Sequence, residues 1–232
     1  MCLPGPLPSQ ARLKLDQAFR RRRPLARGEM IYIAGRPAHS VYAIRNGSVK
    51  TYAVNGAGDE IVQGFYLPGE VIGLESLSDV RHDHFAVALE PTLYCEIQAT
   101  SLKSLLVDTI ELRQQVMDIM NERLRSVRHD SIARARRDAA AQLAAFLMDL
   151  SCRNRRRGLP ANCLRLSMDR RDIANFLGLS VETVSRSFTR LQQAGWLDVR
   201  GKSVLIAEPH ALEELCGTTF IAAGPTVRRV NG

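Results

Sequence analysis

Three polar residues near the C-terminal end of the chain share the spacing of one helix face: Glu182, Ser185 and Arg186. Residues three and four apart on a helix are neighbours on its surface. An arginine can fork onto guanine O6 and N7, a carboxylate can accept from the cytosine amino group, and a serine can contact a base or a thymine methyl. The trio therefore favours readout of DNA bases, although a solvated Glu–Arg pair on an ordinary helix has the same pattern.

The elements around this trio read as a helix-turn-helix. Ser167 and Ser180 each precede a helical pattern, where a hydroxyl can cap free backbone N–H groups, and Gly178 lies in the turn between the two patterns. We expect the first helix over about 169–176 and the second from Val181. The residues predicted to be buried are Ile173, Phe176, Val184, Phe188 and Leu191.

A β-hairpin with a basic tip is predicted after the second helix, from Trp196–Val199 and Ser203–Ile206. Such a hairpin is typical of a wing. Trp196 is expected to pack in the core. Phosphate contacts position a protein on DNA without specifying sequence, and the candidates for them are Arg170, Arg171, Ser180, Arg200 and Lys202.

Charge supports a polyanionic partner for this end of the chain. The 232 residues carry a formal net charge of +8, with 32 basic and 24 acidic side chains. Residues 1–136 hold 18 basic and 15 acidic residues, whereas the shorter 137–232 segment holds 14 and 9. Nearly all the cations are arginine, which suits phosphate and guanine but is also what an Arg-rich codon usage would produce.

Residues 27–100 read as an all-β domain, a sandwich or a barrel. The pair Asn46–Gly47, between VYAI and SVKTY, predicts a tight hairpin because both positions of that turn favour positive φ. The expected strands are Glu29–Ile33, Ser40–Ile44, Ser48–Val54, Glu60–Tyr66 and Tyr94–Ala99.

A helix is expected over 101–135, and a further one over about 138–152. An apolar seam with coiled-coil spacing runs along the first: Ile110, Met117, Met120, Leu124 and Val127. A second stripe holds Leu112, Val116 and Ile119. One stripe can face the β domain and the other a second copy of the helix; alternatively, a single amphipathic helix packs on its own domain. We predict a homodimer, and domains over 1–100 (sensor, with an N-terminal helix), 101–136 (dimerisation helix) and 137–232 (DNA binding).

The chain resembles the CRP/FNR family of bacterial transcription regulators, in its FNR/FixK branch. LSMDRRDIANFLGLSVETVSR and GWLDVRGKSVLI resemble the winged helix of that family, and GDEIVQGFYLPGEVIG and LRQQVMDIM resemble its β-roll and dimerisation helix. The resemblance implies an α+β protein with a cyclic-nucleotide-binding-like β-roll, a long dimerisation helix and a winged helix-turn-helix. It further implies a homodimeric activator that reads a TTGAT-N4-ATCAA-like palindrome, recruits RNA polymerase and controls oxygen- or redox-responsive genes.

Cyclic AMP is not expected as the effector. Phe85–Ala86 stands where the resemblance places an Arg–Ser pair in cyclic-AMP-binding members. Without that pair the phosphate loses charge-assisted hydrogen bonds, each worth roughly 1.5–3 kcal/mol. Arg81, His82 and His84 lie nearby, and we interpret them as part of a solvated loop.

Iron–sulfur chemistry is the other effector that the resemblance implies. FNR members hold a [4Fe–4S] cluster with a C-x2-C-x5-C pattern near the N-terminus and one cysteine of the β-roll. Cys95 matches the roll ligand, and Cys2 matches the third N-terminal one. The other two would lie upstream of Met1. Either the cluster has been lost, as in FixK-type members, or the natural protein begins upstream. We expect no cofactor in this polypeptide; a cluster completed by ligands from elsewhere, or a haem, nitric oxide or small-molecule effector, is the alternative.

Other classes of protein are disfavoured. No HExxH, P-loop or GxSxG motif occurs, so we do not expect an enzyme. No apolar run approaches the roughly 18 residues that a membrane span needs, and the N-terminus lacks the features of a signal peptide. We expect a cytoplasmic protein with double-stranded DNA, RNA polymerase and a second copy of itself as partners.

Overall fold

A computed structural model describes residues 9–78, 80–134 and 138–217, with side chains for all of these except 128–134. The chain divides into two compact units, one formed by residues 1–129 and 167–178 and the other by 130–166 and 179–232. Among the described residues, no helix combines the length and apolar character needed to cross a membrane.

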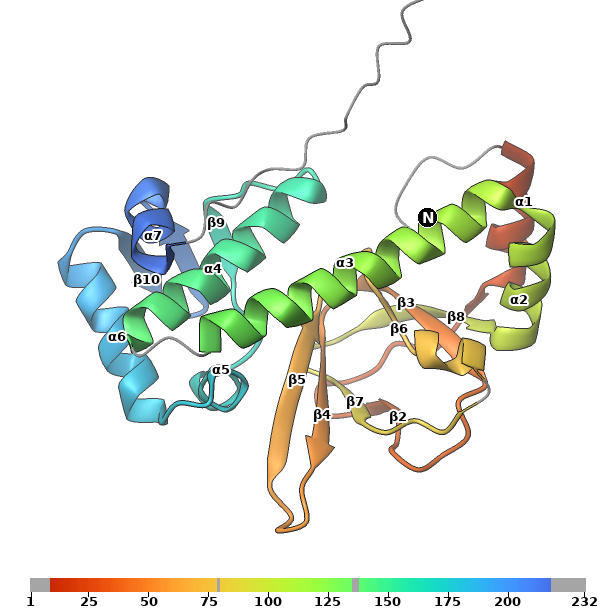
Figure 1. The fold of residues 1–232 in the computed structure, drawn as a ribbon, viewed down its shortest axis with the longest axis horizontal. Helices are drawn as coiled ribbons and strands as arrows, with labels where there is room; N and C mark the ends of the chain where they lie inside the picture. Colours follow the sequence, from red (N-terminus) through yellow and green to blue (C-terminus); the bar gives the residue numbers. More distant parts are fainter. Residues whose placement is uncertain (1–8, 79, 135–137, 218–232) are drawn as a thin grey trace, which may run out of the picture. The chain divides into compact units, whose positions relative to one another are not determined.

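The first unit is built around two four-stranded antiparallel sheets (Figure 1). One has the order β1-β8-β3-β6 and the other β2-β7-β4-β5. The strands are β1 (Arg20–Arg21), β2 (Met30–Tyr32), β3 (Ser40–Asn46), β4 (Val49–Val54), β5 (Glu60–Tyr66), β6 (Val71–Ile72), β7 (Phe85–Ala88) and β8 (Leu93–Gln98). The two-sheet arrangement confirms the expected all-β core.

The expected hairpin at Asn46–Gly47 is wrong. Gly47 does adopt the left-handed conformation, with φ +80°. However, β3 pairs with β8 and β6, whereas β4 pairs with β5 and β7. The turn therefore carries the chain from one sheet to the other. A Cβ on Gly47 would lie 2.5 Å from the carbonyl oxygen of Pro91, so the close approach of the β7–β8 connection also requires glycine here.

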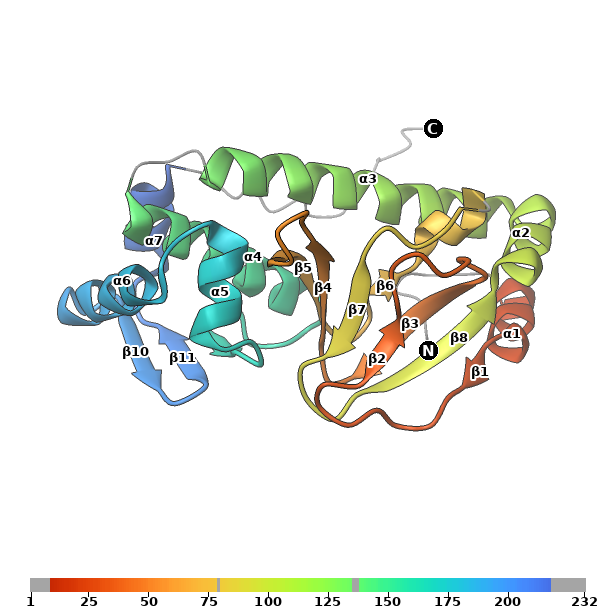
Figure 2. The same cartoon turned by 90° about the horizontal axis from the view of Figure 1, so that it is seen from below.

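Three helices cover one face of the first sheet: α1 (Ser9–Ala18), α2 (Ala99–Asp108) and α3 (Ile110–Arg134) (Figure 2). The helix expected over 101–135 is broken at Thr109, which is extended at φ −130°. The Arg113 side chain donates to the carbonyls of Leu106 and Val107 at 2.9 and 3.1 Å. Arg113 thereby satisfies carbonyls at the end of α2 that have no partner within the helix.

The two apolar stripes of α3 have different surroundings. Leu112 and Val116 are 1% and 4% exposed in the core beneath β3 and β8, and Ile119 packs against the same core. One stripe was expected to face the β domain, and the structure shows that it is the second. The seam residues Ile110, Met117, Met120, Leu124 and Val127 are 72%, 52%, 36%, 57% and 46% exposed.

The second unit contains α4 (Ala139–Arg156), α6 (Val181–Gln193), α7 (Pro209–Cys216) and a three-stranded antiparallel sheet. The order of this sheet is β10-β11-β9, with β9 (Cys163–Arg165), β10 (Leu197–Arg200) and β11 (Ser203–Ile206). The helix α5 (Arg170–Leu177) groups with the first unit because it contacts β5.

Candidate DNA-binding site

Helix α6 presents the polar trio on its surface. Ser180 caps the helix, since its hydroxyl accepts from the Thr183 backbone N–H at 3.1 Å, which confirms the expected cap. On the opposite face Val184, Phe188 and Leu191 are at most 2% exposed. Burial of this face leaves Glu182, Ser185 and Arg186 exposed to solvent.

The trio brings a carboxylate and a guanidinium together on one exposed helix face. Three groups hold the pKa of the Glu182 carboxyl below its usual range: its own backbone N–H, the Ser180 hydroxyl and the positive charge of Arg186. Glu182 is therefore an ionised acceptor at neutral pH, and Arg186 supplies donors one turn away on the same face. Arg190, one turn further on, is instead engaged with Asp138 at 3.2 Å.

The first helix of the motif begins with a different cap from the one expected. The N-cap of α5 is Asp169, whose carboxylate accepts from the Asp172 N–H at 2.8 Å. Ser167 is only 3% exposed, and its hydroxyl has no hydrogen-bond partner within the described residues. The capping role predicted for Ser167 is wrong because the helix begins at Arg170, so that Asp169, and not Ser167, is the residue placed to accept from the N–H groups of its first turn. Ile173 and Phe176 are buried as expected, and Gly178 ends the helix at φ 69°.

The predicted wing is present in the second unit. β10 and β11 pair in antiparallel register and are joined by a turn that contains Gly201, at φ 59°. Arg200 and Lys202 are exposed at this tip, and Arg200 pairs with Asp198 at 3.0 Å. Trp196, expected in the core, is half-buried. The sequence did not reveal β9, which adds a third strand by pairing with β11, because three residues of strand carry almost no periodicity.

The two arginines at the start of α5 differ in environment. Arg171 is exposed. Arg170 is half-buried, and desolvation lowers the pKa of its guanidinium. Arg171 is thus the better placed of the two for a phosphate contact.

Comparisons with known proteins agree with this arrangement. Residues 141–215 match the Crp-like helix-turn-helix domain, and residues 22–109 match the cyclic nucleotide-binding domain. The chain is 41% identical to the transcriptional activator protein Anr of Pseudomonas protegens, over 94% of this chain and 89% of the relative. It is 37% identical to the fumarate and nitrate reduction regulatory protein of Shigella dysenteriae, over 94% and 88%. The chain belongs to the CRP/FNR family of transcription regulators.

A solved structure supports the same family assignment. FixK2 of Bradyrhizobium japonicum superposes with a TM-score of 0.76 at 28% identity, over 85% of this chain and 96% of that one. This CRP/FNR-family chain is therefore a DNA-binding transcription regulator, and its β-roll and winged helix are the two parts that the resemblance implied.

The cysteines of this CRP/FNR-family regulator do not assemble a cluster site in the described part of the chain. Cys95 is 1% exposed in the apolar core that Val41, Ile97 and Leu112 share. Cys2 lies outside the described residues. Within the described ranges, no group of three or more His, Cys, Asp or Glu residues could hold a metal ion. The described residues alone therefore do not supply the ligands of a [4Fe–4S] cluster.

The β-roll positions of interest for a cyclic nucleotide are apolar. Phe85 stacks on Tyr52 with ring centroids 5.0 Å apart, and Ala86 is fully buried. Neither side chain can hydrogen-bond a phosphate.

Histidine 82 is not part of a solvated loop, contrary to the sequence interpretation. It is 2% exposed, stacks on Tyr32 at 3.8 Å and lies 2.7 Å, Nδ1 to Oε1, from Glu75. His84 Nε2 lies 2.6 Å from the Tyr32 hydroxyl. Sequence reasoning missed this cluster because its members come from β2, the 3₁₀ helix Leu74–Ser78 and the loop before β7.

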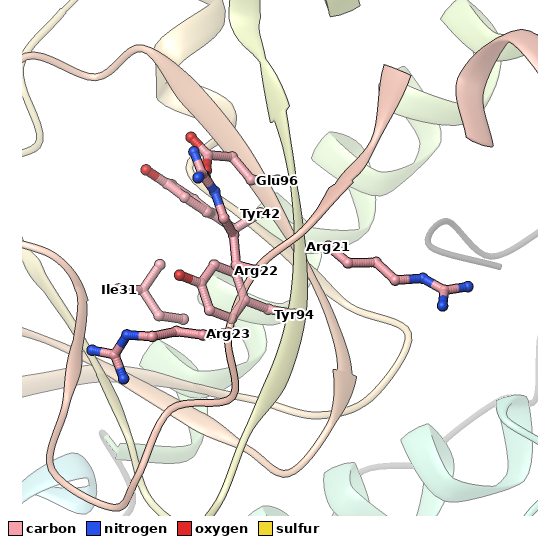
Figure 3. Close-up of a pocket in the computed structure, with 7 residues that line it drawn as sticks. All are labelled: Arg21, Arg22, Arg23, Ile31, Tyr42, Tyr94 and Glu96. Atoms are coloured by element: carbon pink, nitrogen blue, oxygen red, sulfur yellow. The ribbon is translucent and has the colours of Figure 1, made fainter. Parts of the chain in front are cut away.

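A pocket of about 520 Å³ opens beside β1 and β8 (Figure 3). Its lining is Arg21, Arg22, Arg23, Ile31, Tyr42, Tyr94 and Glu96. Arg22 forms an ion pair with Glu96, and Arg23 forms one with Glu29 at 3.0 Å. Burial and the charge of Glu96 raise the pKa of Tyr42 to about 12, so its hydroxyl stays protonated at neutral pH. Since two of the arginines are already neutralised, the pocket does not by itself define an anion site.

Proposed function

We propose that this CRP/FNR-family regulator binds, as a homodimer, a palindrome related to TTGAT-N4-ATCAA and controls genes that respond to oxygen or redox state. The observation that carries the proposal is the exposed trio Glu182, Ser185 and Arg186 in the first turns of a capped helix. A recognition helix contacts base edges with its N-terminal residues. Among the relatives, the protein of Pasteurella multocida that is 39% identical is named an anaerobic regulatory protein, which supports the oxygen-related role.

The homodimer is supported by the two-sided helix α3. One stripe packs on the β-roll, and the five seam residues expose apolar surface on a second face. An exposed, contiguous apolar stripe on a helix is what a coiled-coil partner covers. In the dimer, a second copy of α3 covers this stripe.

The regulator acts by binding rather than by catalysis, in the cytoplasm, and activates transcription by recruiting RNA polymerase to promoters that carry the palindrome. We further propose that this polypeptide functions without cyclic AMP and without an iron–sulfur cluster. The apolar Phe85–Ala86 pair and the burial of Cys95 among apolar side chains support these two statements. A regulator that needs haem, nitric oxide or another effector is the competing hypothesis.

Fluorescence anisotropy with a labelled TTGAT-N4-ATCAA duplex tests the proposal, in air, without ligand and at fixed salt, because affinity for DNA depends steeply on salt. A scrambled duplex is the control. Selective binding of the palindrome supports the proposed function. Equal affinity for both duplexes contradicts effector-free recognition and favours the effector-dependent alternative.

Arg186→Ala isolates direct readout. A bidentate contact to guanine contributes roughly 1–3 kcal/mol of discrimination, so the variant should lose about 5- to 150-fold in affinity for the palindrome. Arg190→Ala removes the same charge from the same helix and is the matched control, since Arg190 pairs with Asp138. If both variants lose affinity equally, or if changing the half-site G to A costs the wild type nothing, Arg186 does not read that base.

A further inference from the structure

Helix α5, the first helix of the helix-turn-helix, packs against the edge strand β5. β5 is the outer strand of its sheet, and such a strand leaves backbone N–H and C=O groups without a neighbouring strand. The Asn175 side chain of α5 fills this position: its amide donates to the Glu60 carbonyl at 2.7 Å and its oxygen accepts from the Val62 N–H at 2.7 Å. One amide thus satisfies the same two backbone groups that a further β-strand would.

A partly buried ion pair reinforces the contact. Lys50 Nζ, on β4, lies 2.8 Å from Asp172 of α5 and 3.0 Å from Glu60. The side chains of Lys50 and Asp172 are 14% and 12% exposed. Burial lowers the pKa of Lys50, but the hydrogen bonds from Asp172 and Glu60 outweigh it and raise the pKa overall, so the lysine is charged at neutral pH.

Apolar packing completes the arrangement. Phe65 of β5 and Phe176 of α5 are 3% and 7% exposed, with ring centroids 5.4 Å apart. We call the set Lys50, Asp172, Asn175, Phe65 and Phe176 the α5 clasp. It combines two backbone hydrogen bonds, an ion pair and an aromatic contact, so it defines both the position and the rotation of α5 on the strand.

Helix α3 also contacts β5. Arg123 of α3 donates to the Gln63 carbonyl at 3.4 Å, and its guanidinium lies 4.8 Å from the ring of Tyr66. Gln63 is the extra residue where the β4–β5 register shifts. Such a bulge locally bends the strand. β5 is therefore contacted by α3 and by α5 within seven residues of strand.

We propose that Asn175 is a positioning residue for DNA recognition, which acts through the α5 clasp by fixing the first helix of the motif to the edge of the β-roll. Only Leu179 and Ser180 lie between Gly178, which ends α5, and the first residue of α6. The short link that leads into α6 therefore starts from an ordered helix end, and a preorganised element loses less entropy on binding. This inference rests on the proposed function.

The test compares Asn175→Ala with Asn55→Ala. Asn55 also accepts from two backbone N–H groups, those of Ala57 and Asp59 at 2.9 Å each, in the same β4–β5 hairpin. It forms no part of the clasp and is therefore a matched control for hairpin stability. Two quantities are measured: hydrogen exchange of the Val62 amide without DNA, and affinity for the palindromic and scrambled duplexes at fixed salt.

We expect Asn175→Ala to accelerate Val62 exchange by roughly threefold to tenfold, the range of one lost hydrogen bond, and to weaken palindrome binding by a similar factor. Asn55→Ala should change neither. Unchanged Val62 exchange in Asn175→Ala would refute the clasp itself. Faster Val62 exchange with unchanged or increased affinity for the palindrome would refute the positioning role. An increased affinity would mean that the clasp restrains DNA binding. A wild type that binds both duplexes equally refutes the proposed function, whatever the exchange result.

Discussion

The dimer seam offers a quantitative prediction at Leu124. In the single chain this residue is 57% exposed on α3. Truncation to alanine removes three carbon atoms, worth about 0.8 kcal/mol each when fully buried, or about 2.4 kcal/mol. Scaled by the exposed fraction, which is the part a partner can cover, the loss is roughly 1.4 kcal/mol per protomer. Both protomers carry the change, so the dimer loses about 2.7 kcal/mol, or roughly 100-fold in its dissociation constant.

Sedimentation equilibrium over a range of concentrations measures this constant directly. Arg125→Ala is the matched control, because one residue along a helix turns the side chain by about 100° and moves it off the seam. We expect wild type and Arg125→Ala to have the same dimer dissociation constant. The constant of Leu124→Ala should be higher. Equal constants for all three proteins would show that the exposed stripe is not the dimer interface. A wild type that is monomeric at micromolar concentration would refute the homodimer itself.

Three further outcomes follow from local contacts. Ser180→Ala removes the α6 cap and should cost about 1 kcal/mol of stability, seen as a lower Tm; Ser185→Ala, at an exposed position, should leave Tm unchanged, and equal shifts would contradict the cap. Leu191→Ala, at 0% exposure, should cost about 2–5 kcal/mol in denaturant unfolding; a loss well under 1 kcal/mol would mean that this face of α6 is not packed. The hydrogen bond from His84 holds the pKa of Asp83 below its ordinary value of 3.8, so Asp83 stabilises the fold above that pH and this contribution disappears as the pH falls through the lowered value. Asp83→Asn should therefore be less stable than the wild type at pH 6 and lose less between pH 5 and pH 3, and parallel pH profiles in urea would rule this out.

Two β-roll residues bear on the proposal that this regulator functions without cyclic AMP. At Phe85–Ala86, where the resemblance places an Arg–Ser pair, the strand carries an aromatic stack and a buried methyl group. The polar groups of this region, His82 and Glu75, are instead engaged with each other. Neither the Phe85 nor the Ala86 side chain offers a hydrogen-bond donor to a cyclic phosphate, which agrees with the proposal that cyclic AMP does not control this regulator.

Residues with short-range patterns were predictable. The spacing of Glu182, Ser185 and Arg186, the Ser180 cap and the buried Val184 all depend on one helix, whose period of 3.6 residues is written in the sequence. Where two residues close together can each cap a helix, the predicted start can be wrong by a residue or two, as at Ser167 and Asp169. Family motifs extended the prediction to the β-roll and to the long helix α3.

Long-range pairing was not predictable in the same way. Asn46–Gly47 predicted a turn correctly. Whether the two flanking strands pair with each other depends on the other strands that compete for their edges, and here β3 pairs with β8 and β4 with β7. The burial of His82 depends on Glu75 and Tyr32 from other elements.

The sequence by itself determined helix α6, its cap, the wing and the two stripes of α3, because each rests on interactions between residues a few positions apart. The tertiary structure alone decided the strand order, the break at Thr109, the core placement of Cys95 and the α5 clasp. Lys50 and Asp172 stand 122 positions apart, and no local period brings such residues together. Their contact exists only once the sheet has formed and α5 packs against the edge strand β5.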